Sequence, residues 1–307
     1  MSTVASPRLA SLAPPTGARA VWALLRPHQW AKNALIVAPA ALAHRLGEPE
    51  TLAAVGVAFV AMSLCASGTY VVNDWLDRER DRAHPTKRTR PLAAGTVPPG
   101  VALGLAAVLV GAAFALAVAA LPLGFAAVLA AYTVTTLAYS LRLKAVELVD
   151  VLVLAALYAL RVLAGGEAAS VPLSEWLLGF SLFFFLALAL LKRYAELRLV
   201  ETGEAPADNG RGYEPGDTAL VLAAGTACGL LAVLVFSLYT ATADVQKLYG
   251  TPARLWLVTP PLLYWTLRMW LLAHRGQMPD DPVLFAVKDP ASYAAAAAVV
   301  GVLALAL

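Results

Sequence analysis

The stretch NDWLDRERDRAHPTKRTRP, residues 73–91, decides how this sequence folds, because it places dense charge directly after an apolar run. If the helix of that run continues through it, Asp74, Asp77 and Asp81 stand at positions i, i+3 and i+7 and share one face. Asn73 lies on the same side. Three carboxylates at the C-terminal end of a helix repel one another and oppose the helix dipole. They therefore need a positive partner.

Two explanations fit this spacing. Carboxylate oxygens are the ligands that Mg²⁺ prefers, and protein-bound Mg²⁺ often links one or two carboxylates to substrate phosphates. Alternatively, the stretch is a solvated loop whose acids pair with its own arginines. The basic residues Lys87, Arg88 and Arg90 follow at once and suit phosphate contacts, or anchor the loop at the inner membrane surface. A diphosphate substrate requires acidic side chains that bind a metal ion next to basic side chains that bind phosphate.

The composition indicates an integral membrane protein. Of the 307 residues, 60% are hydrophobic and only 14% are charged, and the mean hydropathy is +0.70. Apolar runs of about 20 residues match the thickness of a bilayer. They show no period-two alternation, so they predict helices and not barrel strands. The net charge of +3 is too small to indicate nucleic acid binding.

We predict an all-α bundle of about nine transmembrane helices in a single domain over residues 21–307, preceded by a disordered tail over residues 1–20. The expected spans lie at roughly 33–46, 51–72, 100–120, 123–141, 148–165, 174–191, 218–240, 254–272 and 290–307.

The distribution of Lys and Arg predicts the orientation. With the N-terminus inside, the inner segments hold 19 of these residues and the outer segments hold 3. Such a split follows the positive-inside rule. We therefore expect a multi-pass protein of the plasma membrane, with its N-terminus and every charge-rich loop in the cytoplasm.

The pattern NDxxDxxxD at residues 73–81, at the inner end of the second of about nine helices, resembles the UbiA superfamily of intramembrane prenyltransferases. The longer form NDxxDxxxDxxHPxKxxRP is similar to one branch, the decaprenyl-phosphate phosphoribosyltransferases. Further stretches resemble that branch: RPHQWAKN (26–33), YSLRLK (139–144), DVLVLAALYALRVLAGG (150–166), LKRYAEL (191–197) and DPVLFAVKD (281–289).

The resemblance implies a reaction and a set of partners. Phosphoribose would pass from 5-phosphoribosyl 1-diphosphate to a polyprenyl (decaprenyl) phosphate, diphosphate would leave, and the product would be a precursor of cell-wall arabinan. The fold would hold a cavity that opens to the cytoplasm. Mg²⁺ would be bound by Asp74, Asp77 and Asp81, and the branch is compatible with homo-oligomers. Because the acceptor phosphate is already ionised, no catalytic histidine is expected, and His84 would shape the loop.

The resemblance also suggests substrate contacts at the inner ends of other spans. Lys32 would bind phosphate, although it also suits an interfacial anchor. Tyr139 and Lys144 would contact the sugar phosphate. Lys192 and Arg193 would complete a basic rim, although Lys192 also stands at i, i+4 to Glu196. Where much of the superfamily has a second motif, DxxxD, this sequence has only Asp150.

Arg161 lies in the middle of a predicted span. A charged residue at this depth costs a few kcal/mol, so it faces the interior and has partners. Asp150 lies 11 positions earlier, near the same helix face but about 16 Å away along the axis. The two residues would line one cavity, or Arg161 would form a structural ion pair within the bundle.

Two other functions compete. An ordinary prenyltransferase of the same fold would take a prenyl diphosphate and an aromatic or other acceptor; the HPxK loop and the incomplete second motif favour the phosphoribosyl reaction. A transporter would place charge near the bilayer midplane and repeat its halves. Here nearly all charge lies at one face of the membrane, and we see no inverted repeat.

Overall fold

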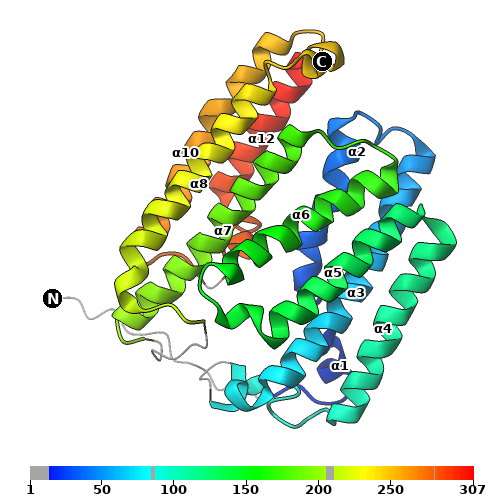
Figure 1. Cartoon of the computed structure of the whole chain (residues 1–307), viewed down its shortest axis with the longest axis vertical. Helices are drawn as coiled ribbons and strands as arrows, with labels where there is room; N and C mark the ends of the chain where they lie inside the picture. Colours follow the sequence, from blue (N-terminus) through cyan, green and yellow to red (C-terminus); the bar gives the residue numbers. More distant parts are fainter. Residues whose placement is uncertain (1–13, 84–86, 205–210, 280) are drawn as a thin grey trace.

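The computed structural model describes residues 14–83, 87–204, 211–279 and 281–307, and every regular element in them is a helix (Figure 1). The N-terminal half contains α1 (Gly17–Leu25), η1 (Pro27–Val37), α2 (Ala38–Leu42), α3 (Pro49–Ala83), η2 (Lys87–Thr89), α4 (Pro99–Ala120), α5 (Leu123–Leu141), η3 (Leu143–Ala145) and α6 (Val149–Ala169). The C-terminal half contains α7 (Glu175–Glu201), η4 (Pro215–Asp217), α8 (Thr218–Tyr239), α9 (Ala243–Leu248), η5 (Pro252–Val258), α10 (Thr259–His274), α11 (Pro282–Ala286) and α12 (Pro290–Ala306).

Six helices in the described part of the chain are long and apolar enough to cross a membrane: α3, α4, α5, α6, α7 and α8. They coincide with the second to seventh predicted spans. The eighth predicted span is η5 followed by α10, and the ninth is α12, with 17 residues. The all-helical membrane bundle is therefore confirmed, and the total of nine spans stays a prediction.

The beginning of the chain differs from the prediction in two places. Residues 17–20, assigned to a disordered tail, form the first turn of α1, and residues 1–13 lie outside the described part. The predicted span 33–46 is not one α-helix but the 3₁₀ helix η1 followed by the short helix α2. Pro27 opens η1 and Pro39 lies in the first turn of α2, and proline interrupts regular α-helical hydrogen bonding.

α3 has 35 residues, well above the roughly 20 that cross a bilayer. At 1.5 Å per residue it is about 52 Å long. Its last turns therefore extend beyond the apolar stretch Pro49–Leu76 and carry the acidic residues on the same continuous helix. The predicted common face of Asp74, Asp77 and Asp81 follows from this continuity.

The helices pack around two main cores. One core lies among α3, α4, α5 and α6, with Phe125, Met62 and Tyr132 among its buried residues. The other lies among α6, α7, α8 and α10 and includes Trp270 and Tyr194. Figure 1 shows the two groups side by side, with α6 and α7 between them. Both cores depend on α6, so residues on its inner faces meet both halves.

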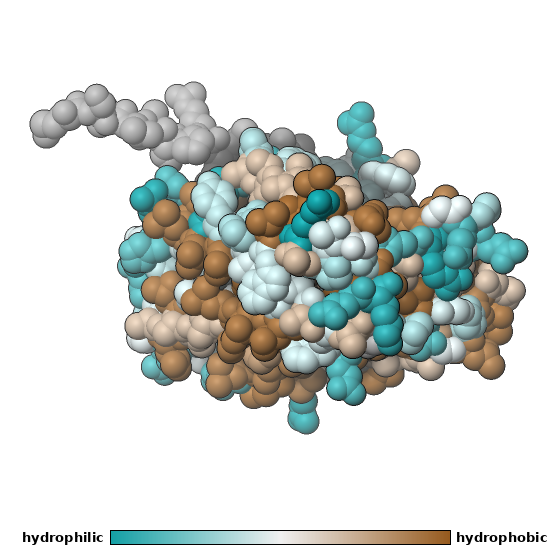
Figure 2. All heavy atoms as spheres, turned by 90° about the horizontal axis from the view of Figure 1, so that it is seen from above, coloured by the Kyte–Doolittle hydropathy of each residue, from teal (hydrophilic) through white to brown (hydrophobic). Residues whose placement is uncertain are grey.

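The outer surface is suited to lipid. Large apolar side chains are exposed on several spans, including Val108, Leu123, Val134 and Leu220. Figure 2 looks down on the end of the bundle near the C-terminus and shows hydrophobic residues along its flanks. Exposed apolar residues on this scale are typical of a surface that faces hydrocarbon.

Candidate active site

Two carboxylates of the α3 motif converge on arginine. Asp74 is 3% exposed and forms an ion pair with Arg26, which lies in the turn between α1 and η1. Arg90, just after η2, reaches both acids: its Nη1 lies 3.3 Å from Asp74 Oδ1 and 2.7 Å from Asp81 Oδ2. Burial raises the pKa of Asp81 in spite of Arg90. The loop after α3 thus folds back onto the acidic face.

The third carboxylate of the motif has a different partner. Lys144 of η3 donates to Asp77 Oδ1 at 2.6 Å, and its Nζ lies 3.5 Å from Asn73 Oδ1. Lys144 is buried, whereas Asp77 keeps 23% of its side chain exposed. The structure therefore brings Lys144 to Asn73 and Asp77, which lie 71 and 67 positions earlier in the sequence.

The donor chemistry of the α3 face suits Mg²⁺, since it offers several carboxylate oxygens. Arg90 Nη1 bridges Asp74 and Asp81, which marks a point where two carboxylates meet around one positive group. In the residues that the structure describes, however, no three acidic, His or Cys side chains form a group that could hold a metal. Each carboxylate of the motif is paired with Arg or Lys instead. A bound ion would have to take the place of these cations.

The other basic residues of the loop differ in exposure. Lys87 is partly buried, and burial together with Arg90 lowers its pKa. The charges of Glu196 on α7 and of Arg211 also act on Lys87, so the loop after α3 lies within electrostatic reach of the other half of the bundle. Arg88 is exposed. His84 lies outside the described residues.

Asp150, at the start of α6, is fully buried. Its Oδ1 accepts from the Tyr213 hydroxyl at 2.6 Å, and its Oδ2 lies 2.9 Å from Arg193 Nε. Burial and Asp150 together raise the pKa of Tyr213. Arg193 is 1% exposed and also contacts Glu196. Both oxygens of Asp150 thus face protein groups, which assigns it to holding α6, α7 and the loop at Tyr213 together.

Two further predicted residues lie beside this network. Lys192 Nζ is 4.0 Å from Glu196, the i, i+4 pair that the sequence allowed. The Tyr139 hydroxyl accepts from Arg211 at 2.6 Å, and the Arg211 guanidinium lies 5.7 Å from the centre of the Tyr139 ring. Both residues are therefore near the basic rim.

Arg161 is buried in the bundle, with neutral partners. It donates to Asn33 Oδ1 at 2.9 Å, to the Tyr132 hydroxyl at 2.9 Å and to the carbonyl of Leu157 at 2.7 Å. Its guanidinium also lies 5.3 Å from the centre of the Tyr158 ring. Among the described residues no ion pair includes Arg161, so the structural ion pair considered from the sequence is wrong. Arg161 and Asp150, which the sequence placed near one helix face, have no hydrogen-bond partner in common among the described residues.

Lys32, in the N-terminal part of the chain, pairs with Asp281 in the C-terminal part. Its Nζ donates to Asp281 Oδ2 at 2.7 Å and lies 6.0 Å from the centre of the Tyr158 ring. Asp281 also caps α11 by accepting from the backbone of Val283 and Leu284. Burial alone would raise the pKa of Asp281, but Lys32 lowers it below the usual range.

Sequence reasoning missed several residues of this region. Arg26, Arg211, Tyr213 and Asp281 were not predicted as site residues, yet each contacts one that was. Arg26 and Asp281 stand in RPHQWAKN and DPVLFAVKD, which had been linked to the resemblance. Their place in these two stretches was the signal that could have identified them as site residues. Arg211 and Tyr213 lie in the loop that follows α7. In the folded chain they contact Tyr139 of α5 and Asp150 of α6, and these contacts depend on the tertiary structure.

The comparisons define the family. Residues 34–288 match the UbiA prenyltransferase family, and the chain belongs to it. The fold is likewise that of a UbiA homolog from Archaeoglobus fulgidus bound to DMAPP and Mg²⁺, with a TM-score of 0.67 at 15% identity over 92% of this chain and 98% of that one. The predicted superfamily is confirmed.

Three relatives give the finer context. The uncharacterized protein y4nM of Sinorhizobium fredii is 39% identical over 88% of this chain, but the match spans only 52% of that protein. The nodulation protein NoeC of Azorhizobium caulinodans is 34% identical over 87% of this chain and 86% of its own length. The decaprenyl-phosphate phosphoribosyltransferase of Mycobacterium tuberculosis is 44% identical over 59% of this chain and 61% of that enzyme.

Proposed function

We propose that this protein transfers 5-phosphoribose from 5-phosphoribosyl 1-diphosphate to a polyprenyl phosphate, with Mg²⁺ as cofactor. The bond between the anomeric carbon and the diphosphate breaks, an oxygen of the acceptor phosphate bonds to that carbon, and diphosphate leaves. Both substrates carry phosphate, and the donor carries three phosphate groups. The site must therefore bind far more negative charge than a prenyltransferase with a neutral acceptor would meet.

The observation that carries this proposal is the set of cationic side chains at the motif and in the bundle beside it. The buried and half-buried side chains named above include nine cations and six carboxylates. The cations are Arg26, Lys32, Lys87, Arg90, Lys144, Arg161, Lys192, Arg193 and Arg211, and the carboxylates are Asp74, Asp77, Asp81, Asp150, Glu196 and Asp281. A polyanionic ligand would meet several Lys and Arg donors in this region.

The roles of individual residues follow from their positions. Asp74, Asp77 and Asp81, with Asn73, would hold Mg²⁺, which neutralises charge on the departing diphosphate. Arg90 and Lys144 already pair with these carboxylates and would bind the donor phosphates once released from them, together with Lys87. Arg88, Tyr139, Lys192 and Arg193 remain proposed substrate contacts at the rim. No strong general base is needed, because the acceptor phosphate is ionised.

The relatives support the reaction in part. The similarity to the mycobacterial phosphoribosyltransferase covers about three fifths of either chain, whereas the name of NoeC refers to nodulation and states no reaction. The fate of the product, including its use in cell-wall arabinan, is accordingly a second and separate proposal. So are the plasma membrane as its location and the cytoplasm as the side of the site.

The test is direct. Purified protein is given labelled 5-phosphoribosyl 1-diphosphate, decaprenyl phosphate and Mg²⁺, and label is counted in the organic phase. We expect label with the wild type, none with EDTA, and recovery when Mg²⁺ is restored. Asp77→Ala should lower the rate at least about 100-fold, roughly 3 kcal/mol of transition-state stabilisation.

Glu79→Ala is the matched control, because Glu79 lies on the same helix but is 66% exposed and pairs only with surface arginines in the described contacts. It should stay within about twofold of the wild type. If no label is transferred, and a prenyl diphosphate is consumed when an aromatic acceptor is added, the phosphoribosyl reaction is wrong and the ordinary prenyltransferase is correct.

A further inference from the structure

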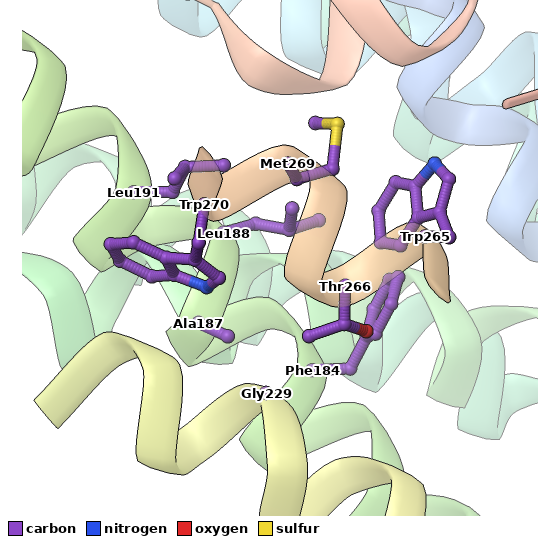
Figure 3. A pocket seen from close by; sticks show the side chains of 9 residues that line it. All are labelled: Phe184, Ala187, Leu188, Leu191, Gly229, Trp265, Thr266, Met269 and Trp270. Carbon is purple, nitrogen blue, oxygen red and sulfur yellow. The ribbon is translucent and has the colours of Figure 1, made fainter. Parts of the chain in front are cut away.

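A crevice lies between α3, α4 and α5, and none of its lining residues belongs to the candidate site. Its volume is about 260 Å³. All three helices contribute to the lining, which consists of Thr69, Val72, Leu103, Ala106, Ala107, Val110, Thr133 and Leu137. By contrast, the pocket in Figure 3, between α7, α8 and α10, has a volume of about 10 Å³ and can hold little more than one water molecule. The crevice is large enough for part of an organic ligand.

The wall of the crevice is apolar. Its two polar side chains are satisfied within their own helices. Thr69 Oγ1 donates to the carbonyl of Ala66 at 2.9 Å, and Thr133 Oγ1 donates to the carbonyl of Leu129 at 2.7 Å. Such a hydroxyl leaves its methyl group for contact with a ligand. The other lining residues are Ala, Val and Leu, so the crevice suits a hydrocarbon chain rather than a sugar or a phosphate.

The depth of the crevice matches one leaflet of a bilayer. On α4 it extends from Leu103 to Val110, which lie about 6 Å and about 16 Å along the axis from Pro99 at the start of the helix. Half of a hydrocarbon core of about 30 Å is about 15 Å. α4 lies at the edge of the bundle (Figure 1), and Ala107 in the lining is exposed. We therefore expect a chain from the leaflet at the motif end of the bundle to enter the crevice.

An arginine without an ion pair stands beyond the crevice at the motif end. Thr69, Leu76 and Arg80 stand at i, i+7 and i+11 on α3 and share one face. Arg80 is exposed and lies about 6 Å along the axis beyond Leu76, where the apolar stretch of α3 ends. Within the described part of the chain it forms no ion pair, whereas Arg78 and Arg82 both pair with one glutamate. A free cation at the membrane surface attracts anionic lipid head groups.

We propose that the crevice binds an anionic glycerophospholipid, with one acyl chain between α4 and α5 and the head-group phosphate at Arg80. Apolar contact along the crevice supplies affinity for the chain, and the charge of Arg80 favours an anionic head group over a zwitterionic one. The lipid would hold α4 and α5 against the part of α3 that precedes the motif, since Val72 of the lining is two positions before Asp74.

The test is lipid binding to the detergent-solubilised protein, measured by native mass spectrometry with anionic phosphatidylglycerol and zwitterionic phosphatidylcholine. Ala107→Phe should weaken phosphatidylglycerol about tenfold, because the phenyl ring would occupy the crevice. Ala112→Phe is the matched control. Ala112 is also exposed on α4, but it lies about 140° around the helix from Ala107 and outside the crevice. This control should leave the affinity unchanged.

A second pair of variants tests the head group. Arg80→Gln should weaken phosphatidylglycerol about fivefold and leave phosphatidylcholine unchanged, since it removes one charge at the membrane surface. Arg275→Gln is its control, because Arg275 is also exposed but follows α10 in the other half of the bundle. It should change neither affinity.

Should Ala107→Phe fail to fold, the wild type is labelled with phosphatidylglycerol that carries a diazirine in one acyl chain. Label is expected on peptides of α4 and α5. Unchanged affinity in Ala107→Phe, or label confined to α7, α8 and α10, would overturn the site. Unchanged affinity in Arg80→Gln would overturn the assignment to an anionic head group.

Two further results would assign the crevice to another occupant. A changed oligomeric mass of Ala107→Phe would indicate that a second copy of the chain covers the crevice. Displacement of phosphatidylglycerol by an equal concentration of decaprenyl phosphate would indicate that the crevice belongs to the acceptor. Either result overturns the proposal. Binding is measured without the sugar donor and without turnover, so the outcome is independent of the proposed function.

Discussion

At the scale of single residues, the ion pair between Asp150 and Arg193 is almost fully shielded from solvent. Removing one member of such a pair leaves a buried charge without its partner, which costs about 3–5 kcal/mol. Asp150→Ala should therefore lower the thermal midpoint of the purified protein strongly or prevent its accumulation. Size-exclusion chromatography after a series of heating steps measures this midpoint.

The double variant Asp150→Ala with Arg193→Met is the control, since it removes both charges. It should recover part of the lost stability, because replacing both members of a buried pair is much less costly than breaking it. A double variant less stable than either single variant would contradict this account. Activity that is lost while stability is kept would instead indicate direct substrate contact by Asp150.

At the scale of elements, α3 and α4 approach closely at Gly68. A Cβ atom built there would lie 2.7 Å from Val110 Cγ2 and 2.9 Å from the carbonyl oxygen of Ala106. Gly68→Ala should separate the two helices and cost about 1–3 kcal/mol, as overpacking does in other cores. The loss is measured as a lower thermal midpoint.

Gly56 provides the comparison on the same helix, because its added Cβ would meet no atom of another helix within 4 Å. Gly56→Ala should be neutral or slightly stabilising, since alanine favours helix. Equal effects of the two substitutions would show that helix propensity, and not the contact with α4, determines the cost. The acidic motif lies on the same helix, so this contact also fixes where Asp74 and Asp77 stand.

At the scale of the whole molecule, the positive-inside rule predicts that Arg142 faces the cytoplasm and Lys247 faces the outside. Single cysteines are placed at the two positions, as Arg142→Cys and Lys247→Cys, after Cys65 and Cys228 are changed to alanine. In intact cells a membrane-impermeant maleimide should label the variant at position 247 alone. Labelling of the variant at position 142 without permeabilisation would invert the orientation.

The sequence predicted the periodic features well. Hydrophobic length located six spans, and the spacing of Asp74, Asp77 and Asp81 predicted their common face on α3. The first segment was predicted as a short span interrupted by Pro39, and the structure has the 3₁₀ helix η1 and the short helix α2 there instead of one α-helix. Hydropathy measures length and polarity, and does not report backbone geometry.

What the sequence by itself determined is thus the class of protein, the helices and the residues that carry charge, because these depend on composition and local spacing. Which charges meet was decided only by the tertiary structure. Lys144 reaches Asp77, Lys32 reaches Asp281 and Arg193 reaches Asp150 across tens to hundreds of positions. Local spacing holds no information about such partners, since they depend on how the two halves of the bundle pack against each other.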